Sequence, residues 1–257
     1  MKLQIVAARQ GIQWVKQGER AFLRQPLAFA GLFFLCMALM SVLSVVPLLG
    51  NVLALALLPG ITLGLMAATM ESTRGQFPMP VVLLSAFRAG RTQARAMLLL
   101  GALYAAGFLL VLGVSALADG GKFAHLYLIG ASVTPELLQG ADFQIAALVA
   151  LVLYLPLSLM FWHAPALVHW YGITPVKSLF FSLVACLRNF GAFSVYALAW
   201  MGVFMGVGML AALLATLFGG AELVAEVMFP TAMLLAAMFF TSIYFTFRDS
   251  FQAEEIA

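Results

Sequence analysis

The stretch PLAFAGLFFLCMALMSVLSVVPLLGNVLALALLPGITLGLMAATM, residues 26 to 70, contains no charged side chain. A helix needs about 20 apolar residues to cross a bilayer at a rise of about 1.5 Å per residue, so this stretch has the length of two crossings. It is interrupted by PLLGN (Pro47 to Asn51), in which the proline and the glycine are typical of a tight turn. The stretch therefore predicts two transmembrane helices joined by a short turn.

The rest of the chain has the same character, because 64% of its residues are hydrophobic and only 9% are charged. About a quarter of the residues in a soluble domain are charged, so the composition indicates an integral membrane protein. Four further charge-free runs lie between Arg95 and Asp119, Asp142 and Lys177, Arg188 and Glu222, and Glu226 and Arg248. We therefore expect an all-α polytopic membrane helix bundle that forms a single integral membrane domain over residues 1–257. Its six predicted spans cover residues 26–46, 51–70, 97–117, 143–163, 192–217 and 223–246.

The distribution of basic residues predicts the orientation. Twelve of the thirteen Lys and Arg residues fall on the side of the membrane that holds both termini, and only Lys122 falls on the other. The positive-inside rule makes the basic side the cytoplasm. In a bacterial inner membrane, residues 118–142 would then form a periplasmic loop. Within this loop, Thr134 as N-cap, Pro135 at the first helical position and Gly140 after the end predict one short helix.

Three segments on the predicted cytoplasmic side have helical amphipathic periodicity and are expected to lie in the membrane interface. In residues 1–25, one stripe is Arg9, Gln13, Lys16, Arg20 and Arg24, the opposite stripe is Gly11, Val15, Gly18 and Phe22, and Trp14 suits the headgroup layer. In residues 82–95, one face holds Ser85, Arg88, Thr92 and Arg95, and the opposite side holds Val82, Leu83, Ala86 and Gly90. In residues 176–190, Ser178, Ser182 and Asn189 align against Phe180, Leu183, Val184 and Leu187.

We expect the basic residues of these segments to bind anionic lipid headgroups. The predicted lipid-contacting residues are Arg9, Trp14, Lys16, Arg20, Arg24, Arg88, Arg91, Arg95, Lys177 and Arg188. Nucleic acid is not an expected partner, because long uncharged runs separate the basic residues and they form no extended face.

The chain also contains an internal repeat with a shift of 97 residues. The shift aligns Pro59 with Pro156, Gly75 with Gly172, Pro78 with Pro175, Ser85 with Ser182, and Arg91 with Arg188. Each unit would contain a proline-kinked span, an amphipathic helix and a return span, so the copies would run in parallel across the membrane. Pro230 and the N-terminal segment suggest a weaker third unit.

Proline and glycine positions leave two alternatives open. Kinks at Pro59, Pro156 and Pro230 either shape the bundle or line a cavity. The GxxxG pairs Gly60/Gly64 and Gly202/Gly206 allow close helix contact, within the chain or between protomers. A polar cavity near the prolines would favour transport, and an exposed face of small residues would favour assembly.

Few ionisable groups are placed for chemistry inside the membrane. Glu222 and Glu226 share a face at the start of the last span and are weak candidates for receiving a cation or a proton, although acidic residues also favour a helix N-terminus. His163 and His169, six residues apart, do not share a helical face and lack a ligand partner nearby. No motif points to a metal, a cofactor or a catalytic site, which disfavours an enzyme.

The stretches WVKQGERAFLRQPLAF (Trp14 to Phe29) and SLVACLRNFGAF (Ser182 to Phe193) resemble a family of uncharacterised proteobacterial inner-membrane proteins of about this length. The resemblance implies an inner-membrane location and supplies no catalytic residues. Together these features favour an accessory or organising protein that binds lipid, another membrane protein or a second copy of itself. The alternative is a transporter of a lipid or another amphiphilic small molecule.

Overall fold

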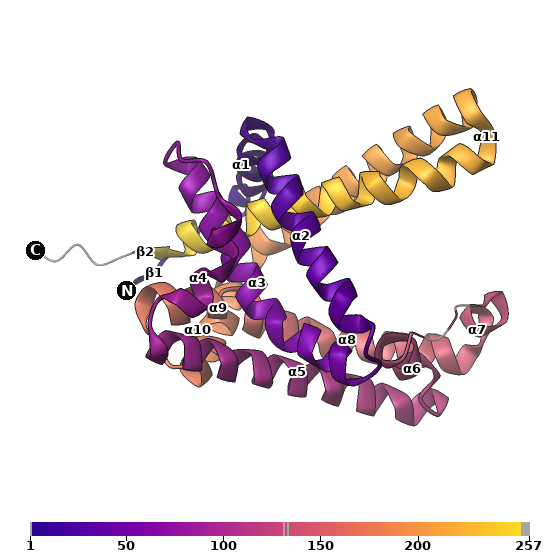
Figure 1. Cartoon of the computed structure of the whole chain (residues 1–257), viewed down its shortest axis with the longest axis horizontal. Helices are drawn as coiled ribbons and strands as arrows, with labels where there is room; N and C mark the ends of the chain where they lie inside the picture. The colour runs from indigo at the N-terminus through magenta and orange to yellow at the C-terminus, as the bar shows by residue number, and fades with distance from the viewer. Residues whose placement is uncertain (1, 131, 133, 253–257) are drawn as a thin grey trace, which may run out of the picture. The chain divides into compact units, whose positions relative to one another are not determined.

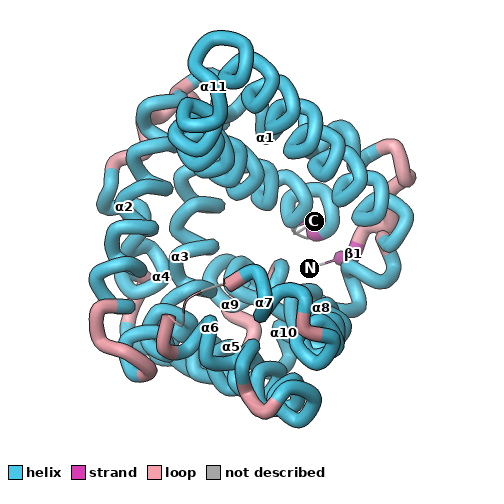
Figure 2. Tube along the Cα trace, turned by 90° about the vertical axis from the view of Figure 1, so that its right-hand side faces the viewer, coloured by secondary structure: helices cyan, strands magenta, loops and turns pink. Residues whose placement is uncertain are grey.

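The computed structural model describes residues 2–130, 132 and 134–252, without the side chains of residues 219, 221, 222, 225 and 252. Helices make up nearly all of this part of the chain (Figures 1 and 2). The helices are α1 (Gln10–Arg24), α2 (Pro26–Ser44), α3 (Leu49–Thr73), the 3-10 helix η1 (Pro80–Leu84), α4 (Ser85–Arg88), α5 (Arg91–Asp119), α6 (Lys122–Leu128), α7 (Pro135–Gln139), α8 (Ala141–Trp162), α9 (Ala164–Tyr171), α10 (Pro175–Arg188) and α11 (Phe190–Ser250). The strands are β1 (Lys2–Leu3) and β2 (Phe251–Gln252).

Six helical segments in the described part of the chain are long and apolar enough to cross a membrane. They are Pro26–Ser44, Leu49–Thr73, Arg91–Asp119, Ala141–Tyr171, Phe190–Phe218 and Glu226–Ser250. The expectation of an all-α chain with six long apolar helices is therefore confirmed. The last two segments are the arms of α11, which folds back on itself at Gly220 (Figure 1). At φ 74° and ψ −165°, this residue has a backbone conformation that glycine adopts readily and other residues do not.

Contacts divide the chain into two compact units. The first unit contains residues up to Phe34, Leu65–Val82 and the C-terminal part from Ala185, so its main elements are α1 and α11. The second unit contains Leu35–Gly64 and Leu83–Val184, with α5 and α8 at its centre.

In the first unit, the two ends of the described chain are tied together. Strand β1 pairs antiparallel with β2, with Lys2 opposite Gln252 and Leu3 opposite Phe251. The buried side chain of Asn189 continues this attachment, because its Oδ1 accepts the Val6 N–H (2.8 Å) and its Nδ2 donates to the Gln4 carbonyl (2.9 Å). One side-chain amide thereby bonds two backbone groups of the segment that follows β1.

In the second unit, small residues allow the helices to approach closely. A Cβ at Gly101 of α5 would collide with the Ala56 carbonyl oxygen of α3, and one at Gly107 would lie 2.7 Å from the Leu157 side chain of α8. The start of helix α6 is held by a side chain of α5. The Asp119 carboxylate accepts the Gly121 and Phe123 N–H groups at its start (2.8 and 2.7 Å).

A serine hydroxyl separates α8 from α9. The Oγ of Ser182 donates to the Leu159 carbonyl (2.7 Å) and accepts the His163 N–H (2.9 Å), so it is inserted where a helix would join these two groups directly. The buried side chain of His163 lies at this junction, and His169 lies in α9. The break is therefore made by the residue at the predicted repeat position, although the repeat itself stays a prediction.

The prediction of one amphipathic helix carrying Ser85, Arg88, Thr92 and Arg95 is wrong. The helix breaks at Gly90 (φ 111°, ψ 164°), so Arg88 ends α4 whereas Arg91 and Arg95 lie in the first turns of α5. The periodicity was counted across a glycine whose backbone is far from the helical region.

Helix α10 has the expected two faces, but its polar face is the buried one. Ser178 and Ser182 are buried, and so is Asn189 directly after the helix. On the apolar face, Phe180 and Leu187 are 61% and 54% exposed, and Leu183 and Val184 are half-buried. Apolar side chains that face hydrocarbon carry no penalty, and polar ones need hydrogen-bond partners inside the protein.

In the loop at residues 118–142, the short helix predicted after Thr134 is present as α7, and Thr134 Oγ1 accepts the Leu137 N–H (3.3 Å). The loop contains a second helix, α6, that the sequence analysis did not predict.

Candidate functional site: the groove between α1 and α11

The apolar stripe of α1 packs on α11 at very short range. Gly11, Val15, Gly18 and Phe22 are all buried. A Cβ at Gly11 would collide with the Ala192 carbonyl oxygen, and a Cβ at Gly18 would collide with the Ser242 side chain. The two glycines lie two helical turns apart, so they let the backbone of α1 touch both arms of α11 along its length.

Polar side chains fix the register of this contact. The Asp249 carboxylate accepts hydrogen bonds from Gln10 Nε2 (2.7 Å) and Trp14 Nε1 (2.9 Å). The neighbouring Arg248 donates to Asp249 Oδ1 (2.8 Å) and to Gln17 Oε1 (2.9 Å). These bonds join the start and middle of α1 to the last turn of α11, and charge-assisted hydrogen bonds are stronger than neutral ones.

The two arms of α11 are joined by a hydrogen-bonded cluster next to α1. The Ser242 hydroxyl lies 2.6 Å from the Tyr196 hydroxyl and accepts the Trp200 indole N–H (3.2 Å). The ring of Trp200 also contacts Phe239 edge-on, at 5.6 Å between ring centroids. This cluster forms the floor of the region where α1 meets both arms.

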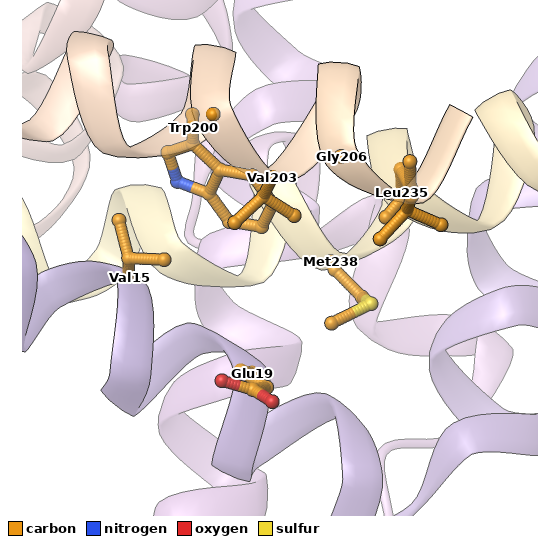
Figure 3. A pocket seen from close by; sticks show the side chains of 9 residues that line it. Val15, Glu19, Trp200, Val203, Gly206, Leu235 and Met238 are labelled. Carbon is orange, nitrogen blue, oxygen red and sulfur yellow. The ribbon is translucent and has the colours of Figure 1, made fainter. Parts of the chain in front are cut away.

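Beside the cluster lies an open groove of about 470 Å³. It is lined by Val15, Glu19, Trp200, Gly202, Val203, Gly206, Val207, Leu235 and Met238. Figure 3 shows Val15 and Glu19 on α1 facing Trp200 and Val203 of the first arm, with Met238 of the second arm between them. We call this the α1/α11 groove. Its walls are apolar except for the carboxylate of Glu19.

The space beside the two glycines of the α1/α11 groove is not occupied by other described residues. A Cβ at Gly202 or Gly206 would have no heavy atom within 4 Å among the described residues. The other GxxxG pair behaves differently, because a Cβ at Gly60 would lie 3.1 Å from Phe87 and one at Gly64 would lie 2.8 Å from the Leu83 backbone. One pair therefore serves packing within the chain, and the other faces outward.

Glu19 was not among the predicted site residues. It is exposed at the edge of the groove, and its carboxylate has no hydrogen bond or ion pair among the described residues. The sequence signal was its position next to the apolar stripe, one turn after Val15. Asp249 and Ser242 had no comparable signal, because the residues of α1 that they contact lie more than 200 residues away in the sequence.

The predicted lipid-contacting residues fall into two groups. Nine of them have exposed side chains: Arg9, Lys16, Arg20, Arg24, Arg88, Arg91, Arg95, Lys177 and Arg188. Trp14 differs, because it is 0% exposed and its indole contacts Phe193, Tyr196 and Asp249. The side chain expected in the headgroup layer is therefore an anchor between α1 and α11.

The remaining candidates do not converge on the groove. Pro59 is buried within α3, whereas Pro156 in α8 and Pro230 in α11 are exposed, and none of the three lines the groove. Glu226 is exposed. The side chain of Glu222 lies outside the described residues.

Comparison with known proteins identifies the family. No protein family model matches the chain, and no solved structure matches it. A protein of Burkholderia thailandensis described as a "Probable inner membrane protein" is 40% identical over an alignment 258 residues long. The alignment covers 99% of this chain and 96% of that protein. The chain belongs to this family of inner membrane proteins. It is a multi-pass inner membrane protein, as the resemblance and the apolar runs led us to expect.

Proposed function

We propose that this inner membrane protein is an accessory or organising subunit that assembles through the α1/α11 groove. The observation that carries the proposal is the outward-facing pair Gly202 and Gly206, which leaves room for the backbone of another transmembrane helix. Association of helices in lipid depends on close packing, and small residues four apart permit that approach.

The occupant that we propose is a second copy of the chain. The groove rim carries Glu19 three residues after Lys16, and both side chains are exposed. In a two-fold dimer the same surface meets itself, so each Glu19 carboxylate would find the Lys16 ammonium group of the other copy. The chain itself thus supplies both the acidic and the basic group of the pair, so an unrelated protein is not needed to neutralise Glu19.

The basic residues support a role at the cytoplasmic surface. The other eight exposed Lys and Arg side chains of the three basic segments would hold anionic headgroups, with both termini in the cytoplasm. Lipid contact would orient the protein in the membrane, and the α1/α11 groove would determine which protein it binds.

Native mass spectrometry of the protein released from gently extracted membranes tests this function. We expect a dimer for the wild type, and association weakened at least tenfold, about 1.4 kcal/mol, by the double substitution Gly202→Ile and Gly206→Ile. The matched control is Gly113→Ile in α5, where an added Cβ also meets no atom within 4 Å. A monomeric wild type, or a dimer that the double variant leaves intact, would contradict the proposal. A stoichiometric complex with a different protein would replace the second copy as the occupant.

The charge pairing has its own test. Glu19→Lys should weaken the dimer by placing like charges together, and combining it with Lys16→Glu should restore association. If both variants associate as the wild type does, the rim charges play no part in assembly.

A further inference from the structure

The second unit contains two neighbouring cavities that the proposed function does not use. One, of about 490 Å³, is lined by Phe108, Val111, Leu112, Phe123, Tyr127, Ala147, Ala150, Leu151 and Tyr154. The other, of about 290 Å³, is lined by Met40, Ser44, Asn51, Ala54, Leu55, Leu58, Tyr104, Phe108, Tyr127, Leu128 and Tyr154. Both share the side chains of Phe108, Tyr127 and Tyr154, so they flank one aromatic cluster. Small-molecule sites commonly have volumes of roughly 300–1,000 Å³.

The cavities differ in chemistry. The larger one is apolar except for tyrosine, whereas the smaller one also contains Asn51, Ser44 and Tyr104. No lining residue of either cavity carries a charge. A phosphate or a carboxylate would therefore be desolvated there without a counter-charge, which disfavours a charged headgroup.

The Tyr104 and Tyr154 hydroxyls supply the recognition element. They lie 3.3 Å apart, which is longer than the usual 2.5–3.0 Å of an O–H···O bond. The pair has two hydroxyl protons for one mutual hydrogen bond, and neither hydroxyl has another partner among the described residues. One O–H donor is therefore left for an acceptor, and an unpaired donor in apolar surroundings is costly.

The donor lies deep in the apolar spans. Tyr104 is near the middle of α5, and Tyr154 is in the second half of α8. Polar groups at such depth in a membrane protein are default candidates for function. An acceptor that reaches them must be tolerated in hydrocarbon, as an uncharged carbonyl is.

The surrounding walls are held in place. The Leu128 carbonyl of α6 accepts hydrogen bonds from the Leu48 N–H (3.0 Å) and Asn51 Nδ2 (2.8 Å). Phe108 packs edge-on against both Tyr127 and Tyr154, at 6.0 and 5.9 Å between ring centroids. A fixed aromatic wall of this kind favours a preorganised site.

We propose that this pair of cavities binds an uncharged lipid whose carbonyl oxygen accepts a hydrogen bond from the Tyr104/Tyr154 pair and whose hydrocarbon chain occupies the larger cavity. The carbonyl belongs either to an isoprenoid quinone ring or to the ester of a neutral acylglycerol. Both present the same acceptor to the same donor.

Binding to the purified protein in detergent, followed by native mass spectrometry during titration, tests the site. The probes are decylubiquinone, dioctanoylglycerol and dodecylbenzene, which has a ring and a chain without a carbonyl. We expect saturable one-to-one binding of one or both carbonyl probes, at least threefold tighter than dodecylbenzene. Preference for decylubiquinone assigns a quinone, preference for dioctanoylglycerol assigns an ester, and equal binding assigns the carbonyl alone.

Two pairs of variants locate the site. The double variant Tyr104→Phe and Tyr154→Phe removes both hydroxyls but keeps the rings, and it should weaken binding of the carbonyl probe roughly three- to tenfold. The control Tyr244→Phe lies outside the cavities and should not weaken binding. Ala147→Phe should fill the larger cavity and weaken binding more than tenfold, while Leu148→Phe, at an exposed neighbouring position, should leave it intact. Equal binding of all three probes, or binding unchanged in both test variants, would overturn the proposal.

Discussion

Substitution of Gly18 by alanine tests how closely α1 docks on α11. A Cβ at this position would lie 2.7 Å from the Cα and 3.0 Å from the backbone nitrogen of Ser242. Carbon atoms in ordinary contact are about 3.5–4.0 Å apart, so α1 must move outward by roughly 1 Å. Backbone atoms cannot rotate away as a flexible side chain does. The added methyl group therefore strains the contact between α1 and α11.

The cost follows from the contacts that would be stretched. Overpacking costs about 1–3 kcal/mol. The movement also lengthens the Thr241 to Gly18 hydrogen bond (3.2 Å) and the Trp14 to Asp249 hydrogen bond (2.9 Å), each worth about 1 kcal/mol. The higher helix propensity of alanine offsets about 1 kcal/mol. We expect the free energy of opening α1 to fall by about 2–4 kcal/mol.

Hydrogen–deuterium exchange of peptides from residues 10–24 measures that free energy directly. A loss of about 2 kcal/mol or more accelerates exchange roughly 30-fold or more, if exchange occurs from the opened state. The matched control is Gly31→Ala in α2, where a Cβ meets no atom within 4 Å. Exchange in the Gly18 variant that equals the wild type would refute the docking distance on which the calculation rests.

Three further variants probe other parts of the chain. Asn189→Ala removes the side-chain amide that bonds the Val6 N–H and the Gln4 carbonyl, so exchange of residues 2–6 should rise about tenfold, and an unchanged rate would argue against the amide clamp. Gly90→Ala forces a side chain into φ 111° at a cost of about 1–3 kcal/mol, so the Tm should drop by several degrees, whereas Gly113→Ala should not lower it. Replacing Arg88, Arg91 and Arg95 together with Gln should reduce the anionic lipid that copurifies with the protein, and undiminished retention would count against the lipid-anchor role.

The sequence predicts the helices of this protein well and their partners poorly. Long apolar runs require helices in a bilayer, because every backbone polar group must be satisfied within the segment. The stripe of Gly11, Val15, Gly18 and Phe22 was visible in the sequence as one side of an interfacial helix, and in the structure these four residues are buried against α11. The stripe did not predict that Ser242 would be its contact, because packing between distant segments depends on three-dimensional complementarity and not on local periodicity.

Two errors have a physical origin that the sequence conceals. Gly90 was counted as one more position on a helical face, although its backbone breaks the helix. Trp14 was expected at the lipid surface because tryptophan favours headgroups, but Asp249 offers its indole N–H an acceptor inside the protein. The Gly202/Gly206 pair could be found from the sequence, yet only the structure distinguishes it from Gly60/Gly64, which is covered by Phe87 and Leu83.

The pairing of β1 with β2 constrains how many times the chain crosses the membrane between the two strands. Strands that pair across Lys2 and Gln252 must lie on the same face of the bilayer, so the chain between them crosses an even number of times. The six apolar segments satisfy this condition, and an arrangement with five or seven crossings would break the ladder. Compartment reporters fused to the two ends should therefore always give the same reading, and a variant in which they disagree must have lost the pairing or a span.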